Sequence, residues 1–171
     1  FAGIIIACVI ISIGVQMFQN SQLKSLLSIA VVDSNYNHDE QVEALQNDFL
    51  AYAGTGDKHE VVDVDTSLLS GDDYNAVVKM TVVMGAGTAD MMFCGEETYK
   101  KYKQQEAFLS WKEVLGDDYS KYEEYMTDDG RLDLEKCPNW EKYNMVYYSP
   151  VYAVVMSSSK NLENCIKFLE M

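Results

Sequence analysis

The stretch LLSIAVV, residues 26–32, decides the fold class, because it predicts a buried β-strand. It is apolar except for Ser28, it is rich in β-branched residues, and no proline interrupts it. The polar triplet DSN, residues 33–35, follows directly and is typical of a turn. A continuous apolar run of this kind is expected in a sheet that is covered on both faces.

A helix is predicted directly after this turn. Asn37 is a suitable N-cap, and Glu40 stands three residues later, which is the spacing of a capping box. Gly54 and Gly56 are expected to end the helix. The apolar residues between them are three or four positions apart, so they share one helical face: Val42, Leu45, Phe49 and Tyr52.

The alternation of strand and helix continues along the chain. Residues 60–65 predict a second strand, and residues 89–94 predict a third. Residues 70–73 open a helix between these strands. Its apolar stripe consists of Tyr74, Val77, Val78, Thr81 and Val82. A further helix is expected from Gly95 to about Gln105, with two glutamates in its first turn, where they suit the helix dipole.

The last third of the chain is less regular. Residues 106–145 contain both tryptophans and predict short helices and loops. Residues 150–156, PVYAVVM, predict a fourth strand, and the serines at 157–159 begin a last helix. We therefore expect an α/β fold with a mostly parallel sheet of about four to five strands and helices on both faces.

Residues 1–18, FAGIIIACVIISIGVQMF, are expected to anchor the chain in a membrane. The stretch carries no charged residue, and the first charge after it is Lys24. Crossing the hydrocarbon core takes roughly 20 apolar residues, so a transmembrane helix is predicted, at the short end of the usual length. We divide the chain into a transmembrane anchor with a polar joint, residues 1–23, and an α/β domain, residues 24–171.

Two alternatives to a transmembrane helix exist for this stretch. A cleaved signal peptide requires small residues at its cleavage site, whereas Met17 and Phe18 are bulky. Residues 5–8, IIAC, resemble the lipid-attachment motif of bacterial lipoproteins, in which Cys8 would carry the lipid. A lipidated cysteine normally begins a polar chain, and mostly apolar residues follow Cys8, so the transmembrane helix is favoured.

Composition argues against nucleic acid as a partner. The formal net charge is −14, and all of it lies outside residues 1–18. Phosphate backbones and anionic lipid head groups repel such a chain. The cysteines beyond the apolar stretch are Cys94, Cys137 and Cys165. Their spacing matches no zinc-binding pattern, and it leaves their disulfide pairing open.

The sequence contains no convincing catalytic or cofactor-binding motif. Gly85 and Gly87 follow a predicted helix, whereas the glycines of a dinucleotide-binding motif must open one. The two histidines, His38 and His59, are paired with no nucleophile in the sequence. We therefore expect a non-catalytic protein without a metal or a cofactor.

Three local stretches resemble parts of one known protein family. Residues 84–93, MGAGTADMMF, resemble a passage from a helix through a glycine turn into an apolar strand, with Ala89 in place of the usual proline. Residues 107–115, AFLSWKEVL, are similar to a segment before a leucine-rich turn, and residues 159–169, SKNLENCIKFL, resemble a late helix. The family is that of bacterial extracellular solute-binding proteins with the type II periplasmic-binding-protein fold.

The resemblance covers residues 26–115 and 148–171 and implies one lobe of such a protein. Family members have two lobes, which close on a ligand held between them. About 30 residues separate the two covered parts here, whereas a second lobe needs roughly a hundred. We therefore expect a single lobe with the other reduced to a loop, and one lobe cannot clamp a solute by hinge closure.

A ligand site of such a domain is expected beyond the carboxyl ends of the parallel strands. The residues predicted to lie there are Asp33, Ser34, Asn35, Thr66, Ser67, Cys94, Gly95 and Glu96. Short polar side chains suit hydrogen bonding to a ligand, but turns require the same residue types. Four aromatic residues are expected either to cover this edge or to pack as core: Tyr119, Tyr122, Tyr125 and Trp140.

These observations predict a membrane-tethered binding or interaction module, with its acidic domain on the outer side of the cell membrane. Its partner is expected to be a small solute, a peptide or another membrane protein. The alternative is a structural or accessory subunit of a membrane complex that has no small-molecule ligand.

Overall fold

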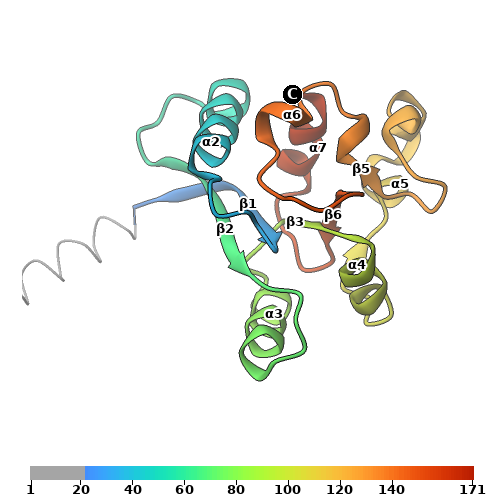
Figure 1. Cartoon of the computed structure of the whole chain (residues 1–171). Helices are drawn as coiled ribbons and strands as arrows, with labels where there is room; N and C mark the ends of the chain where they lie inside the picture. The colour runs from blue at the N-terminus through green and yellow to red at the C-terminus, as the bar shows by residue number, and fades with distance from the viewer. Residues whose placement is uncertain (1–21) are drawn as a thin grey trace, which may run out of the picture.

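A six-stranded sheet organises the chain, of which the computed structural model describes residues 22–171 (Figure 1). The strands are β1 (Lys24–Val32), β2 (Glu60–Leu68), β3 (Met91–Cys94), β4 (Phe108–Leu109), β5 (Leu132–Asp133) and β6 (Tyr152–Met156). Their order in space is β2-β1-β3-β6-β4, and β5 also pairs with β6. The predicted apolar strand thus lies inside the sheet, between β2 and β3.

The sheet is mixed, which corrects the expectation of a mostly parallel one. β1 runs parallel to β2 and to β3, whereas β6 runs antiparallel to β3, β4 and β5. Cys94 at the end of β3 pairs with Tyr152 at the start of β6, so β3 ends and β6 begins at the same edge of the sheet. The expectation was wrong because an apolar strand looks the same in either direction.

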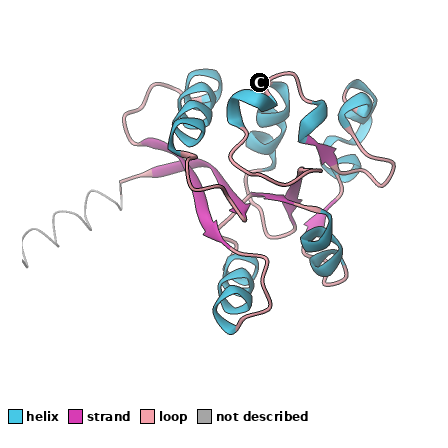
Figure 2. Cartoon of the chain, in the orientation of Figure 1, coloured by secondary structure: helices cyan, strands magenta, loops and turns pink. Residues whose placement is uncertain are grey.

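Six α-helices and three 3₁₀-helices are described (Figure 2). The α-helices are α2 (Asp39–Ala53), α3 (Tyr74–Ala86), α4 (Glu96–Lys103), α5 (Trp111–Leu115), α6 (Trp140–Tyr143) and α7 (Leu162–Glu170). The 3₁₀-helices are η1 (Gly116–Lys121), η2 (Glu123–Tyr125) and η3 (Leu134–Lys136).

Helices cover both faces of the sheet, as expected. α2, α5, α6 and α7 lie on one face, and α3 and α4 lie on the other (Figure 1). Successive side chains of a strand point to opposite faces, so each strand contributes to two cores. In β1, Ile29 and Val31 belong to the first core, and Ala30 and Val32 belong to the second.

The start of α2 differs from the prediction. The N-cap position is His38, and its side chain makes no capping hydrogen bond. The capping box expected from Asn37 to Glu40 is therefore wrong. A different bond holds the preceding turn, in which the backbone N–H of Asn37 donates to the side-chain oxygen of Asn35 at 3.1 Å.

α3 is a helix, as predicted, but the opposite face is buried. Asp73 caps it by accepting hydrogen bonds from the backbone N–H groups of Asn75 and Ala76 at 3.0 and 3.2 Å. Its buried side chains are Ala76, Met80 and Val83. Exposed positions include Tyr74, Val77, Val78, Thr81 and Val82. The helix is apolar on more than one side, so periodicity alone does not select the face that packs.

Residues 106–145 form short helices, loops and the two-residue strands β4 and β5, which were not predicted. This segment contributes much of the first core, through Trp111, Leu115, Met126, Leu132, Leu134, Trp140, Tyr143 and Met145. The indole N–H of Trp111 donates to the carbonyl of Ala153 in β6 at 2.8 Å. The segment therefore packs against the sheet along its length.

Within residues 22–171, none of the helices is both long and apolar enough to cross a membrane. The transmembrane helix predicted at residues 1–18 lies outside the described residues, and so does Cys8 with its alternative role in lipid attachment.

Candidate functional site

The carboxyl ends of β1, β2 and β3 lie at one edge of the sheet, because these strands are parallel neighbours. A cavity of about 310 Å³ opens there, and we call it the edge cavity. This volume is at the lower end of the range for small-molecule sites. Its lining residues are Asp33, Ser70, Gly95, Glu96, Glu97, Thr98, Tyr147, Tyr148, Ser149 and Pro150.

The loop before β6 forms one wall of the edge cavity and is fastened to the end of β1. Val146 and Ser34 form an isolated antiparallel bridge. The backbone N–H of Asn35 donates to the carbonyl of Met145 at 2.8 Å. These bonds place the next residues of the loop, from Tyr147 onward, beside the carboxyl ends of the strands.

Two neighbouring tyrosines of this loop have different roles. The Tyr148 hydroxyl donates to the carbonyl of Val32 at 2.9 Å, and burial raises the pKa of Tyr148, so the hydroxyl remains a donor. Tyr147 is 76% exposed and meets Tyr148 edge to face, with ring centroids 6.3 Å apart, a usual distance for an aromatic pair. Tyr147 therefore offers an aromatic ring at the mouth of the cavity.

Asp33 turns the chain at the end of β1. Its φ angle is 51°, in the left-handed region, which aspartate tolerates better than most residues. Its backbone N–H donates to the carbonyl of Leu68 at 2.9 Å, and its side chain accepts from the backbone N–H of Ser70 at 3.0 Å. Asp33 thus ties the end of β1 to the end of β2 and brings a carboxylate to the cavity.

The first turn of α4 forms the floor of the edge cavity. Gly95 is its N-cap and supplies no side-chain capping bond, so the first backbone N–H groups of the helix have no side-chain cap. A Cβ atom at Gly95 would lie 3.3 Å from a ring carbon of Tyr148. The missing side chain therefore lets Tyr148 approach and leaves the helix amides open to the cavity.

Glu96 forms two ion pairs at the side of the cavity. It contacts the guanidinium of Arg131, and it lies 2.9 Å from the ammonium of Lys100. Hydrogen bonds from Arg131 and then Lys100 lower the pKa of Glu96 to about 2. Glu96 therefore stays ionised and is a poor candidate for a general base near neutral pH.

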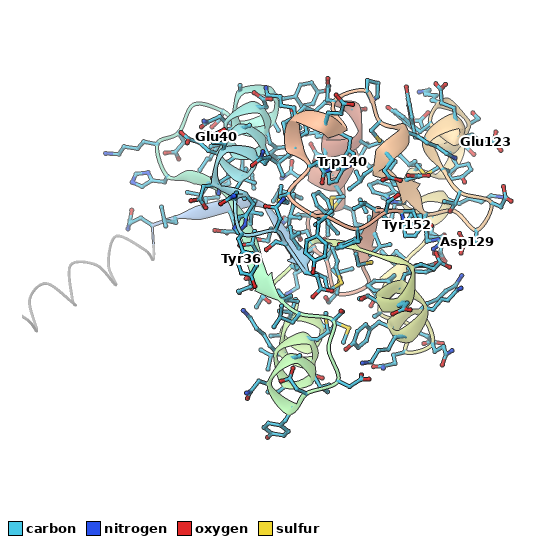
Figure 3. The ribbon with its side chains drawn as sticks, viewed as in Figure 1. Tyr36, Glu40, Glu123, Asp129, Trp140 and Tyr152 are labelled. Carbon is cyan, nitrogen blue, oxygen red and sulfur yellow. The ribbon has the colours of Figure 1, made fainter. Side chains whose placement is uncertain are left out.

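Arg131 is held on several sides. It donates to Asp129 at 2.8 Å, and its guanidinium carbon lies 4.0 Å from the ring centre of Tyr152 and 4.5 Å from that of Tyr99. Asp129 and Tyr152, which both contact Arg131, are labelled in Figure 3. This cluster fixes the position of Glu96.

Cys94 lies in the second core and does not line the edge cavity. It is fully buried, and this burial raises the pKa of its thiol to about 12. A thiol in such surroundings is not a nucleophile at neutral pH. Cys94, Cys137 and Cys165 are all free thiols, and burial raises the pKa values of the last two to about 11 and about 12.

Four other predicted residues lie near this edge without lining the cavity: Ser34, Asn35, Thr66 and Ser67. The Ser34 hydroxyl donates to the carbonyl of Thr66 at 2.8 Å, so this pair links β1 to β2. Ser67 contacts Asp65 and Lys79, on the exposed side of β2. Thr66 and Ser67 are inside β2, which runs to Leu68, and not beyond its end as predicted.

Seven cavity residues were not among those predicted: Ser70, Glu97, Thr98, Tyr147, Tyr148, Ser149 and Pro150. Four of them are consecutive and precede β6. In a parallel strand these residues would lie at the opposite edge, so the mistaken strand direction concealed them. The available signal was the run of two tyrosines, a serine and a proline, because serine and proline are typical of a turn.

Four aromatic residues were expected either to cover this edge of the sheet or to pack as core, and they pack in or against the first core. Trp140 is buried in the first core. Tyr119, Tyr122 and Tyr125 are partly buried against the same core. They lie on the face covered by α2 and α7, so they do not close the edge cavity.

Comparison with protein-family models, with curated proteins and with solved structures gave no match in any of the three. Within residues 22–171, no three His, Cys, Asp or Glu side chains gather as metal ligands. The edge cavity combines an exposed aromatic ring, backbone donors, hydroxyls and carboxylates. This arrangement suits the binding of a small polar molecule.

Proposed function

We propose that this protein is a membrane-attached, extracytoplasmic binding module that resembles one lobe of a solute-binding protein. The edge cavity is the observation that carries the proposal. It lies beyond the carboxyl ends of parallel strands, where open α/β sheets bind their ligands.

The lining of the cavity favours a small polar solute or the end of a peptide. The ring of Tyr147 can cover an apolar face of a ligand. The first backbone N–H groups of α4 can donate to ligand oxygen atoms, at the positive end of the helix dipole. Asp33 and Glu97 can accept hydrogen bonds from ligand hydroxyl or amino groups.

The segment between β3 and β6 supports the comparison with a single lobe. It begins and ends at the same edge of the sheet, as a connection to a second lobe would, but α4 packs into the second core and the residues from Trp111 onward pack into the first. A single lobe covers one side of a ligand, so weak and rapidly reversible binding is expected. Such binding suits a sensor or an accessory subunit.

Membrane attachment is proposed from the sequence of residues 1–18, which is apolar and uncharged. The net charge of −14 makes adhesion of the acidic domain to anionic head groups unfavourable. The domain is therefore expected to stand away from the bilayer surface, with its edge cavity accessible to solutes.

Tyr147→Ala tests the site. The full chain, purified in a polyoxyethylene ether detergent, is screened by thermal shift against monosaccharides, amino acids and dipeptides. A ligand that stabilises the unaltered protein is expected to bind about tenfold more weakly to Tyr147→Ala, because an aromatic contact worth roughly 1.5 kcal/mol is lost. Calorimetric titration measures the affinity.

Tyr74→Ala is the matched control, because Tyr74 is also an exposed tyrosine but lies at the start of α3, outside the edge cavity. Its affinity for the same ligand should equal that of the unaltered chain. If both variants lose affinity equally, or if no compound in the three classes stabilises the protein, the edge cavity is not the binding site.

The exposed side of α3 favours a second candidate function, as a subunit that assembles with other copies or with a membrane protein. Val78 and Val82 are 40% and 55% exposed there. If α3 is an assembly surface, Val78→Lys with Val82→Lys is expected to reduce the sedimenting mass of the detergent-solubilised protein without lowering Tm. An unchanged mass would exclude this surface.

A further inference from the structure

A second pocket lies on the other side of the molecule from the α3 layer, among η2, η3, α6 and the end of α7. Its volume is about 280 Å³, and it shares no residue with the edge cavity. Its lining residues are Tyr122, Tyr125, Leu132, Leu134, Cys137, Pro138, Asn139, Trp140, Tyr143, Phe168, Leu169, Glu170 and Met171. We call it the aromatic pocket.

Aromatic rings form several of its walls, and two of these are fixed by contacts outside the pocket. Trp140, labelled in Figure 3, meets Phe93 of the sheet edge to face, with ring centroids 5.8 Å apart. The Tyr143 hydroxyl donates to Asp48 of α2 at 2.5 Å. Walls that are held in place before binding cost less entropy when a ligand enters.

One carboxylate is placed at the rim. Glu170 accepts a hydrogen bond from Tyr122 at 3.4 Å on one oxygen and from Tyr52 of α2 at 3.2 Å on the other. Among the lining side chains it is the one that carries a formal charge. Two lysines lie near this carboxylate, and each is paired with another acid: Lys167 with Glu163 at 2.7 Å, and Lys121 with Asp118 at 2.7 Å.

We propose that the aromatic pocket binds a small organic cation of the quaternary alkylammonium class. Aromatic faces attract such cations through their quadrupole, and the Glu170 carboxylate adds direct charge attraction. A quaternary ammonium has no N–H to satisfy, so it loses little hydration when it enters an aromatic site. The net charge of −14 also raises the local concentration of cations.

Calorimetric titration of the full chain tests this site, in the same detergent, which has neither a sugar nor an ammonium head group. The probes are choline chloride and its neutral isostere 3,3-dimethyl-1-butanol. Choline is expected to bind saturably and roughly tenfold more tightly than the alcohol, since cation–π contacts contribute about 0.5–2 kcal/mol. Binding should also change the fluorescence of Trp140, and Trp140→Phe should abolish that change.

Glu170→Gln is expected to lower choline affinity several-fold, because it removes the rim charge and keeps the shape of the side chain. Glu141→Gln is the matched control, since it removes one exposed charge from α6 beside the pocket, and Glu141 does not line the pocket. Equal affinity for choline and the alcohol, equal losses in both variants, or no saturable binding would each overturn the proposal. A loss of choline binding in Tyr147→Ala with none in Glu170→Gln would also overturn it, by placing the cation in the edge cavity.

Discussion

Trp111→Ala is expected to lower the free energy of unfolding by about 3–5 kcal/mol, the range for truncating a buried aromatic residue. Trp111 is 1% exposed, it packs in the first core, and its indole N–H bonds to the carbonyl of Ala153. For a domain of this size the loss corresponds to a Tm decrease of roughly 6–20 °C. Differential scanning calorimetry of the full chain measures it.

Two further variants separate the loss of apolar packing from the loss of the indole hydrogen bond. Trp111→Phe keeps most of the apolar contact but removes the hydrogen bond to the Ala153 carbonyl and leaves a smaller ring, so an intermediate loss of about 1–3 kcal/mol is expected. Lys112→Ala changes the exposed neighbour and should alter stability by less than about 0.5 kcal/mol. A Trp111→Ala effect as small as that of Lys112→Ala would show that residues 106–145 are not an integral part of the core.

Arg131→Met is expected to cost about 2–3 kcal/mol at neutral pH, between the values for surface and buried ion pairs. The Arg131 side chain is 12% exposed and bonds to both Glu96 and Asp129. Its loss also removes the stacking on Tyr152 and Tyr99. Glu96 then loses its main partner beside the edge cavity.

The effect of Arg131→Met is expected to depend on pH. In the folded chain the pKa of Glu96 is about 2, below its ordinary value of 4.5, chiefly because of the hydrogen bond from Arg131. A depressed carboxyl pKa contributes stability that is fully present above pH 4.5 and is lost as the pH falls toward 2. The difference in Tm between the unaltered chain and the variant should therefore be constant at higher pH and should shrink across this interval.

Lys121→Met is the control for general charge effects, because its partner Asp118 is 61% exposed and the pair lies on the surface. Lys121→Met should lower the free energy of unfolding by no more than about 1 kcal/mol. The resulting difference in Tm from the unaltered chain should be the same at each pH down to 4.5. The difference in Tm between the unaltered chain and Arg131→Met could also stay constant down to pH 2. In that case the stability that Arg131 contributes does not depend on the ionisation of Glu96.

The candidate site was partly predictable. Asp33, Gly95 and Glu96 follow β1 and β3 directly. They were found because ligands of open α/β sheets bind beyond the carboxyl ends of the parallel strands. Thr66 and Ser67 were misplaced because β2 continues to Leu68, and strand ends are hard to locate when polar residues alternate with apolar ones. Tyr147 and Tyr148 were missed because they precede a strand, and the rule considers residues that follow one.

The sequence by itself determined the four longer strands, β1, β2, β3 and β6, and the four longer α-helices, α2, α3, α4 and α7, since period, β-branched residues and turn residues are local signals. It determined the acidic charge and the apolar residues 1–18 as well. The tertiary structure decided the direction of β6 and the buried face of α3, because both depend on which surfaces meet after the chain has folded. The antiparallel return of β6 is what brings the loop with Tyr147 to the carboxyl ends of β1 and β3, and so creates the edge cavity.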